Sequence, residues 1–121
     1  MNFLIVDDHE IVRSGIKNIL GVLYKPDSIF EAIDEESAMR VYVERAYALV
    51  IMDVPLPKTD TIRLIEFMVQ ENPEIKVLIF SMTPEKIYAS KFYNAGAMGF
   101  VSKSAGLDEL TKAIEDRKSV V

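Results

Sequence analysis

The chain has 121 residues, of which 50% are hydrophobic and 27% are charged, and this is the profile of one ordinary globular domain with an adequate core. It has no cysteine, which excludes disulfides, thiolate metal sites and cysteine nucleophiles. The net charge of -5 argues against direct binding to nucleic acid, and no apolar run is long enough to span a membrane. The amino terminus lacks a basic segment and a cleavage site, so we expect a cytoplasmic protein without a membrane partner.

The amino-terminal residues predict a strand followed by a helix. Residues 3–6 form a short, branched apolar run that is typical of a strand buried on both faces, and this run ends at Asp7 and Asp8. Apolar side chains then recur at helical spacing through residues 11–23. Gly21 is a candidate for the frayed or capped end of this helix.

The next two elements are a weaker strand and a second helix. Residues 28–33 follow the turn residues Pro26 and Asp27, and their broken apolar run is typical of a strand near the edge of a sheet. Asp34 is suited to be the N-cap of the following helix, because its side chain can accept a hydrogen bond from the first turn. The side chains that we expect to face inward from this helix are Ala38, Met39, Val41, Tyr42 and Ala46.

The middle of the chain contains the strand around which the predicted sheet is organised. Residues 48–53 are an unbroken apolar run that ends in the carboxylate of Asp53. The prolines within residues 55–60 fix φ and remove N–H donors, so this segment should be a loop. Residues 62–69 predict a helix that stops at residues 72–73, because the residue before a proline avoids the helical region.

The carboxyl-terminal part repeats the alternation of strand and helix. Residues 77–80 predict a fourth buried strand that ends at Ser81, and residues 83–96 predict a helix that starts with a hydroxyl cap and a proline and ends at Gly96. A last strand at residues 99–102 and a last helix at residues 107–117 follow, the helix with Leu107, Leu110, Ala113 and Ile114 on its inner face. This alternation predicts an α/β fold, with a parallel sheet covered on both faces and right-handed crossovers.

Charged and polar residues stand where the predicted strands end. Asp7 and Asp8 follow the first strand, Asp53 ends the third, Ser81 the fourth and Lys103 the fifth. The carboxyl ends of parallel strands meet at one edge of a sheet, so these groups should be neighbours. Two unit charges about 4 Å apart at an effective dielectric of about 20 repel by about 4 kcal/mol, so clustered carboxylates either take up protons or bind a cation.

The ligands that this cluster offers are oxygens, which favours Mg²⁺ or a similar hard ion. His9 is the one histidine of the chain, and without a second histidine or a cysteine we expect it to be an exposed residue of the first helical turn rather than a ligand. Lys103 opposite a metal-bound carboxylate indicates that an anion occupies the space between them. A phosphoryl group fits this arrangement, with a carboxylate as its covalent acceptor.

The strand-end residues, in their order along the chain, resemble the signature of bacterial response-regulator receiver domains, and the resemblance covers essentially the whole sequence. Residues 8–16, which read DHEIVRSGI, and residues 96–103, which read GAMGFVSK, are similar to the NarL/FixJ branch, whose members carry a LuxR-type DNA-binding domain. The resemblance implies a flavodoxin-like (βα)₅ doubly wound parallel sheet with the strand order 2-1-3-4-5. It also implies that residues 1–121 are one receiver domain. We expect that a C-terminal output domain has been truncated, and a receiver domain that stands alone is the alternative.

The resemblance implies a two-component receiver that takes a phosphoryl group from a sensor histidine kinase onto Asp53. Asp8 and Asp53 would bind Mg²⁺ directly, the backbone carbonyl of Pro55 would supply another ligand, and Asp7 would act mainly through water. The chain would not be an enzyme, apart from slow self-phosphorylation by small donors and self-dephosphorylation. It would act on DNA only through the missing domain, and it would form a homodimer on activation through the first and last helices.

The resemblance also assigns the phosphoryl contacts and the conformational switch. Lys103 and Ser81 would contact the phosphoryl oxygens. Ser81 would move toward the phosphate while Phe100, on the last strand, turns inward. Composition alone favours Phe100 as an ordinary core residue.

Three positions depart from the family pattern. Pro55 stands two residues after the acceptor, where relatives usually offer a backbone N–H to the phosphoryl group, and proline has no such donor. We therefore expect phosphorylation to be less favourable than in typical relatives. Thr61 stands where glycine is common, and Ser104 stands where a proline often follows the lysine. Pro55 keeps open the alternative of a receiver-like interaction domain that signals without phosphate.

Two enzyme or ligand-binding classes are weaker alternatives. A haloacid-dehalogenase-like phosphatase also uses a strand-end aspartate and Mg²⁺, but it needs a second aspartate two residues later as general acid. This chain has Pro55 after Asp53 and His9 after Asp7 at that spacing. A nucleotide-binding module would need a glycine-rich phosphate loop, and neither G-x-G-x-x-G nor G-x-x-x-x-G-K-[ST] is present.

Overall fold

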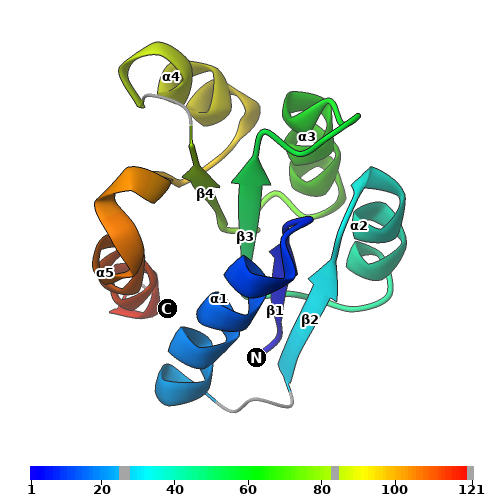
Figure 1. Cartoon of the computed structure of the whole chain (residues 1–121). Helices are drawn as coiled ribbons and strands as arrows, with labels where there is room; N and C mark the ends of the chain where they lie inside the picture. Colours follow the sequence, from blue (N-terminus) through cyan, green and yellow to red (C-terminus); the bar gives the residue numbers. More distant parts are fainter. Residues whose placement is uncertain (25–27, 83–84, 120–121) are drawn as a thin grey trace.

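Five parallel strands form the centre of the molecule, and helices cover both faces of the sheet (Figure 1). The computed structural model describes residues 1–24, 28–82 and 85–119, so the predicted turn at residues 26–27 and the predicted helix start at residues 83–84 lie outside the described part. The strands are β1 Phe3–Val6, β2 Ile29–Ala32, β3 Leu49–Val54, β4 Val77–Ser81 and β5 Gly99–Ser102. The helices are α1 Glu10–Leu23, α2 Glu35–Tyr42, α3 Thr61–Glu71, α4 Glu85–Ala95, the short 3₁₀ helix η2 Lys103–Ala105 and α5 Gly106–Ser119.

The strand order is β2-β1-β3-β4-β5, which confirms the predicted flavodoxin-like topology and the edge position of β2. Alternating residues of each strand pack on opposite faces of the sheet. Ile5 and Ile51 belong to the core under α1 and α5, whereas Leu4 and Val50 belong to the core under α2, α3 and α4 (Figure 1). No helix in the described part of the chain is long and apolar enough to cross a membrane.

The predicted helix ends at polar residues and glycine are confirmed. Asp34 is the N-cap of α2, where its Oδ1 accepts a hydrogen bond of 2.8 Å from the N–H of Ser37. α3 ends at Glu71, directly before its C-cap residue Asn72. Gly96 follows the end of α4 with a φ of 118°, a region that glycine enters far more easily than other residues.

The prediction that the first helix would end near Gly21 is wrong, because α1 continues through this glycine to Leu23. Leu20 is fully buried, and Leu23 still packs against the core under α1 and α5. A glycine inside a helix costs only about 1 kcal/mol, so the burial of apolar side chains on both sides of Gly21 keeps the helix intact.

Two predictions of inward-facing side chains are also wrong. α2 ends at Tyr42, so Ala46 lies beyond the helix and is exposed, and Tyr47 is buried in its place. Leu107 is 46% exposed because α5 already begins at Gly106 and places Leu107 in its first turn. The other three predicted core positions of α5 lie in or against the core: Leu110 and Ile114, which are fully buried, and Ala113, which is partly buried.

Replacing Gly96 with alanine should destabilise the fold, whereas the same change at Gly15 should stabilise it. A Cβ at Gly96 would lie 2.6 Å from Val69 Cγ2, and the φ of 118° is unfavourable for alanine. A Cβ at Gly15, inside α1, would meet Leu107 Cδ1 at 3.5 Å, which is an ordinary contact. We expect Gly96→Ala to lower the free energy of unfolding by about 1–3 kcal/mol and Gly15→Ala to raise it by about 0.5–1 kcal/mol, as measured by urea denaturation.

The double variant Gly96→Ala, Val69→Ala separates the steric contact from the backbone strain at Gly96. Relative to Val69→Ala alone, the added Gly96→Ala change should lower stability by less than it does in the wild-type background. A Gly96→Ala protein as stable as the wild type would contradict the prediction.

Candidate functional site

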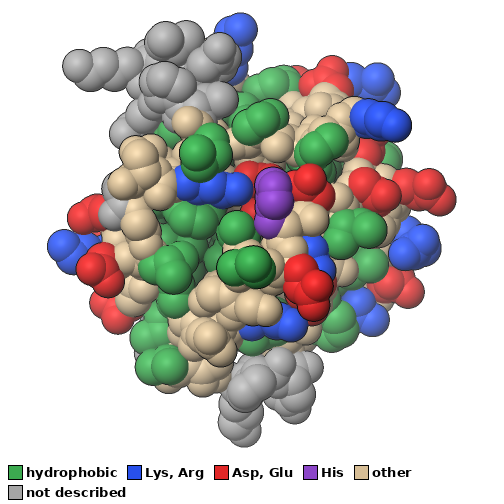
Figure 2. All heavy atoms as spheres, viewed as in Figure 1, with side chains coloured by type: hydrophobic (Ala, Val, Ile, Leu, Met, Phe, Trp, Pro, Cys, Tyr) green, Lys and Arg blue, Asp and Glu red, His purple; other side chains and the backbone are tan. Residues whose placement is uncertain are grey.

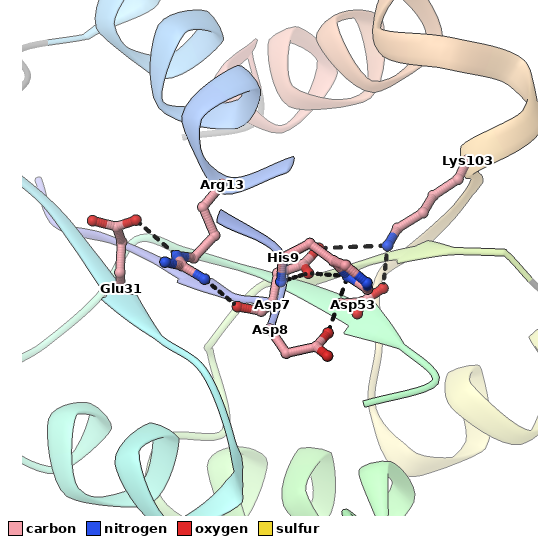
Figure 3. Close-up of polar contacts among 7 residues, drawn as sticks. All are labelled: Asp7, Asp8, His9, Arg13, Glu31, Asp53 and Lys103. Atoms are coloured by element: carbon pink, nitrogen blue, oxygen red, sulfur yellow. Dashed lines mark hydrogen bonds and ion pairs between the residues drawn. The ribbon is translucent and has the colours of Figure 1, made fainter. Parts of the chain in front are cut away.

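The site lies at the carboxyl edge of the sheet, where the ends of β1, β3 and β5 meet (Figure 3). Asp7 follows β1, Asp53 is the penultimate residue of β3, and Lys103 follows β5. The Nζ atom of Lys103 forms an ion pair with Oδ1 of Asp53 and lies 3.4 Å from Oδ2 of Asp7. Groups that are far apart in the sequence therefore meet around one ammonium group.

Asp7 is buried, and the start of α1 holds it in place. Its Oδ1 accepts a hydrogen bond of 2.8 Å from the backbone N–H of His9. Arg13 donates from Nη1 to the backbone carbonyl of Asp7 at 2.9 Å and from Nε to Glu31 Oε1 at 2.9 Å. Partial burial opposes ionisation of Glu31, but the hydrogen bonds from Arg13 and Lys17 outweigh it and lower the pKa of this carboxyl. These contacts tie β1, α1 and β2 together directly behind the site.

Asp53 is buried, and its pKa is raised to about 6. Burial is the main cause, the negative charges of Asp7 and Asp8 add to it, and Lys103 acts in the opposite direction. Among the described residues, Oδ2 of Asp53 is buried without a hydrogen-bond partner. Leaving a buried polar atom unpaired costs about 1–3 kcal/mol, so the site favours a bound group at this oxygen.

The residues present fit a divalent cation. One ligand atom from each of Asp7, Asp8, His9 and Asp53 can be chosen so that all of them lie within 4.8 Å of one another. Three of these residues offer carboxylate oxygens, the ligands that Mg²⁺ prefers. The unpaired Oδ2 of Asp53 is one oxygen to which such an ion could bind.

The other predicted site residues lie at the end of β4, on β5 and in the loop after β3. Ser81 is fully buried, and its Oγ donates a hydrogen bond of 2.9 Å to the carbonyl of Val54. Phe100 is buried in the core under α4, where its ring centroid lies 5.9 Å from that of Phe92. Pro55 is exposed in the loop after β3, and the Val54–Pro55 peptide bond is cis. Phe100 therefore has the contacts of a core residue in this structure.

His9 has a closer relation to the site than the sequence indicated. Its side chain is 64% exposed, as expected, and it is visible at the surface next to acidic side chains (Figure 2). However, its Nδ1 atom lies 3.1 Å from Oδ1 of Asp7 and 3.1 Å from Oδ1 of Asp8. The only signal in the sequence was that His9 directly follows the two aspartates.

Two further residues that support the site were not found from the sequence. Arg13 on α1 holds the backbone of Asp7, and no local sequence pattern pairs it with Glu31, because the packing of α1 against β2 brings the two side chains together. The ring of Phe80 lies under the ammonium group of Lys103, with 5.6 Å between Nζ and the ring centroid. Such a cation–π contact favours an orientation in which the ammonium group lies over the sheet edge.

Comparisons with known proteins identify relatives over nearly the whole chain. Residues 3–115 match the family model described as response regulator receiver domain. The response regulator GacA of Pseudomonas aeruginosa is 31% identical over 111 residues, which is 92% of this chain and 52% of that protein. The transcriptional regulatory protein DegU of Brevibacillus brevis is 26% identical over 115 residues, which is 95% of this chain and 49% of that protein. The chain thus spans about half the length of the curated relatives that it matches.

A solved structure of another response regulator has the same fold. The LuxR-family two-component response regulator from Aurantimonas sp. SI85-9A1 is 34% identical, with a TM-score of 0.81 over 95% of this chain and 82% of that one. Its family agrees with the NarL/FixJ branch that residues 8–16 and 96–103 indicate. The match of the family model favours this assignment over the phosphatase and nucleotide-binding alternatives. The chain therefore belongs to the response regulator receiver domain family of two-component systems.

Proposed function

We propose that this receiver domain accepts a phosphoryl group on Asp53 from a sensor histidine kinase in a Mg²⁺-dependent reaction. The main support is the position of Asp53, a buried carboxylate with one oxygen paired to Lys103 and the other without a partner in the described part of the chain. A carboxylate oxygen would form the bond to phosphorus while the P–N bond of the kinase phosphohistidine breaks, and the electron pair of that bond would leave with the imidazole.

Different neighbours of Asp53 would bind the metal ion and the phosphoryl group. Asp8 and Asp53 would hold Mg²⁺ directly, the carbonyl of Pro55 would be a further ligand, and Asp7 would act mainly through water. When bound, the ion offsets the negative charge of the carboxylates and of the phosphoryl oxygens. Lys103 would bind a phosphoryl oxygen, since its ammonium group already lies between Asp53 and Asp7.

The conformational response would pass through β4 and β5. The hydroxyl of Ser81, which donates to the carbonyl of Val54, would turn to a phosphoryl oxygen, and phosphorylation would favour the inward position that Phe100 has on β5 in this structure. Slow self-phosphorylation by small donors and self-dephosphorylation would accompany this, without turnover of a separate substrate. This two-state behaviour is the general form of a phosphorylation switch.

We propose that the output is control of transcription through a DNA-binding domain outside these 121 residues. DegU, a relative of about twice this length, is a transcriptional regulatory protein. The net charge of -5 makes this receiver itself a poor ligand for the DNA backbone. The receiver would therefore act on transcription by controlling its attached domain.

Activation would bring two receivers together through α1 and α5. These helices pack side by side, and Ile11 and Leu107 on them are 87% and 46% exposed. An apolar groove of about 260 Å³ lies between them, lined also by Gly15, Phe80 and Lys103. Because Lys103 belongs both to the groove and to the phosphorylation site, a change at Asp53 can alter this surface directly.

Incubation with acetyl phosphate and Mg²⁺ should add one phosphoryl group to the wild-type protein, as measured by intact mass. Asp53→Asn should remove this gain, because it removes the acceptor. Asp60→Asn is the matched control, since Asp60 is an exposed N-cap of α3 and asparagine caps as well as aspartate does. Chelation of Mg²⁺ should also abolish the gain. A wild-type protein that gains no mass would overturn the proposal and favour a receiver that signals without phosphate.

Replacing Pro55 with asparagine should raise the steady-state phosphorylated fraction. The new backbone N–H can donate to the acyl phosphate, and a hydrogen bond to a charged group is worth about 1.5–3 kcal/mol. Pro57→Asn, in the same loop, is the control and should leave the fraction unchanged. Equal fractions in the wild type and Pro55→Asn, read by Phos-tag electrophoresis, would refute the explanation.

Beryllofluoride and Mg²⁺ should convert the monomer to a dimer in sedimentation velocity. Ile11→Glu should block the dimer, because it places a charge on the exposed apolar surface of α1. Val43→Glu is the control, since Val43 is 57% exposed at the end of α2, away from this surface. A wild-type protein that stays monomeric, or equal dimerisation of all three proteins, would count against this interface.

A further inference from the structure

His9 is held over the acidic cluster by its own backbone. Its N–H donates to Asp7 Oδ1 at 2.8 Å, and its carbonyl accepts from the N–H of Arg13 at 3.1 Å. His9 occupies the N-cap position of α1, but its side chain makes no capping hydrogen bond. The imidazole is directed instead at the carboxylates, with Nδ1 at 3.1 Å from both Asp7 Oδ1 and Asp8 Oδ1 (Figure 3).

The imidazole and the lysine ammonium group approach different oxygens of the cluster. Lys103 contacts Oδ2 of Asp7 and Oδ1 of Asp53, whereas His9 contacts Oδ1 of Asp7 and Oδ1 of Asp8. The buried Oδ2 of Asp53 has no partner in the described part of the chain. Ligand atoms of the three aspartates and His9 nevertheless lie within 4.8 Å of one another, so a cation that binds the carboxylates comes within reach of the imidazole.

A mixed set of carboxylate oxygens and one imidazole nitrogen distinguishes between metals. Mg²⁺ prefers oxygen ligands and gains little from an imidazole. Zn²⁺ binds both imidazole nitrogen and carboxylate oxygen, and it stands higher in the general order of affinities than the hard ions. A cluster made only of aspartates would lack this additional nitrogen ligand.

We propose that His9 is a nitrogen ligand in the cation site and that it selectively strengthens the binding of Zn²⁺ relative to Mg²⁺. This proposal rests on one part of the proposed function, namely that Asp8 and Asp53 bind the cation. It adds a competing ion, because Zn²⁺ held by His9 and the aspartates would exclude Mg²⁺ from the phosphorylation site. The phosphorylation of this receiver would then depend on the ratio of the two ions.

The first test uses the fact that His9 is the one histidine of the chain, so that imidazole proton resonances of the tag-free protein report on this residue alone. One equivalent of ZnCl₂ should shift these resonances, whereas saturating MgCl₂ should leave them nearly unchanged while it shifts the backbone amides of Asp8 and Asp53. Imidazole resonances that do not respond to Zn²⁺ would overturn the proposal.

The second test compares metal affinities by calorimetry in the wild type, His9→Asn and His9→Ala. Asparagine keeps a hydrogen-bond donor near the Asp7 and Asp8 oxygens but lacks the imidazole nitrogen, and the 64% exposure of the side chain makes both changes compatible with folding. Loss of even an outer partner of a metal ligand costs about 10- to 100-fold in affinity, so both variants should bind Zn²⁺ at least ~10-fold more weakly. Their affinity for Mg²⁺ should stay near that of the wild type.

The outcomes separate this inference from the proposed function. If Mg²⁺ binds and both His9 variants keep the wild-type affinity for Zn²⁺, or if the affinities for both ions fall equally, His9 acts only through hydrogen bonds and the inference is wrong. If wild-type protein binds no Mg²⁺, or if Asp53→Asn leaves Mg²⁺ binding unchanged, it is the proposed Mg²⁺ site that fails. A selective loss of Zn²⁺ affinity in both variants supports the inference.

Discussion

Negative charge crowded at the carboxyl edge of the sheet is the constraint on which the rest of this structure depends. Asp7 and Asp53 are 1% and 2% exposed, and the ammonium group of Lys103 is paired with both of them. A buried carboxylate needs a counter-charge and hydrogen bonds. The single positive charge of Lys103 cannot neutralise the two negative charges of Asp7 and Asp53. The raised pKa of Asp53 and its unpaired oxygen are two consequences of the same deficit. The described residues therefore leave this edge of the sheet short of positive charge.

The surrounding fold stabilises this arrangement and connects it to both faces of the sheet. β3 lies between β1 and β4, and its residues are buried throughout, so the apolar core on each side holds Asp53 at the edge. Arg13 fixes the backbone of Asp7 from α1, and Lys103 extends from the end of β5 over the ring of Phe80. Lys103 also lines the groove between α1 and α5, and the hydroxyl of Ser81 on β4 donates to the carbonyl of Val54, next to Asp53.

Much of this architecture could be predicted because it depends on local properties of the sequence. Apolar runs and helical spacing identified the strands and helices in the described residues. The N-cap at Asp34 followed from its side-chain chemistry, and the end of α3 before Asn72 followed from the proline after it. The meeting of Asp7, Asp53 and Lys103 could also be predicted, because parallel strands place their carboxyl ends at one edge. No knowledge of side-chain packing was needed for either conclusion.

The sequence by itself thus determined the order of elements, the parallel sheet and which residues end the strands. The tertiary structure alone decided how far helices extend and which side chains of neighbouring elements meet. α1 continues through Gly21 because apolar side chains on both sides of this glycine pack against the core. Leu107 is exposed because α5 starts at Gly106, which places Leu107 in the first turn. The contact of Arg13 with Glu31 depends on a distance between segments that only packing brings together, and the direction of the His9 imidazole depends on a side-chain conformation that sequence patterns do not specify. Sequence periodicity records which face of an element is apolar, but it holds no information on such distances.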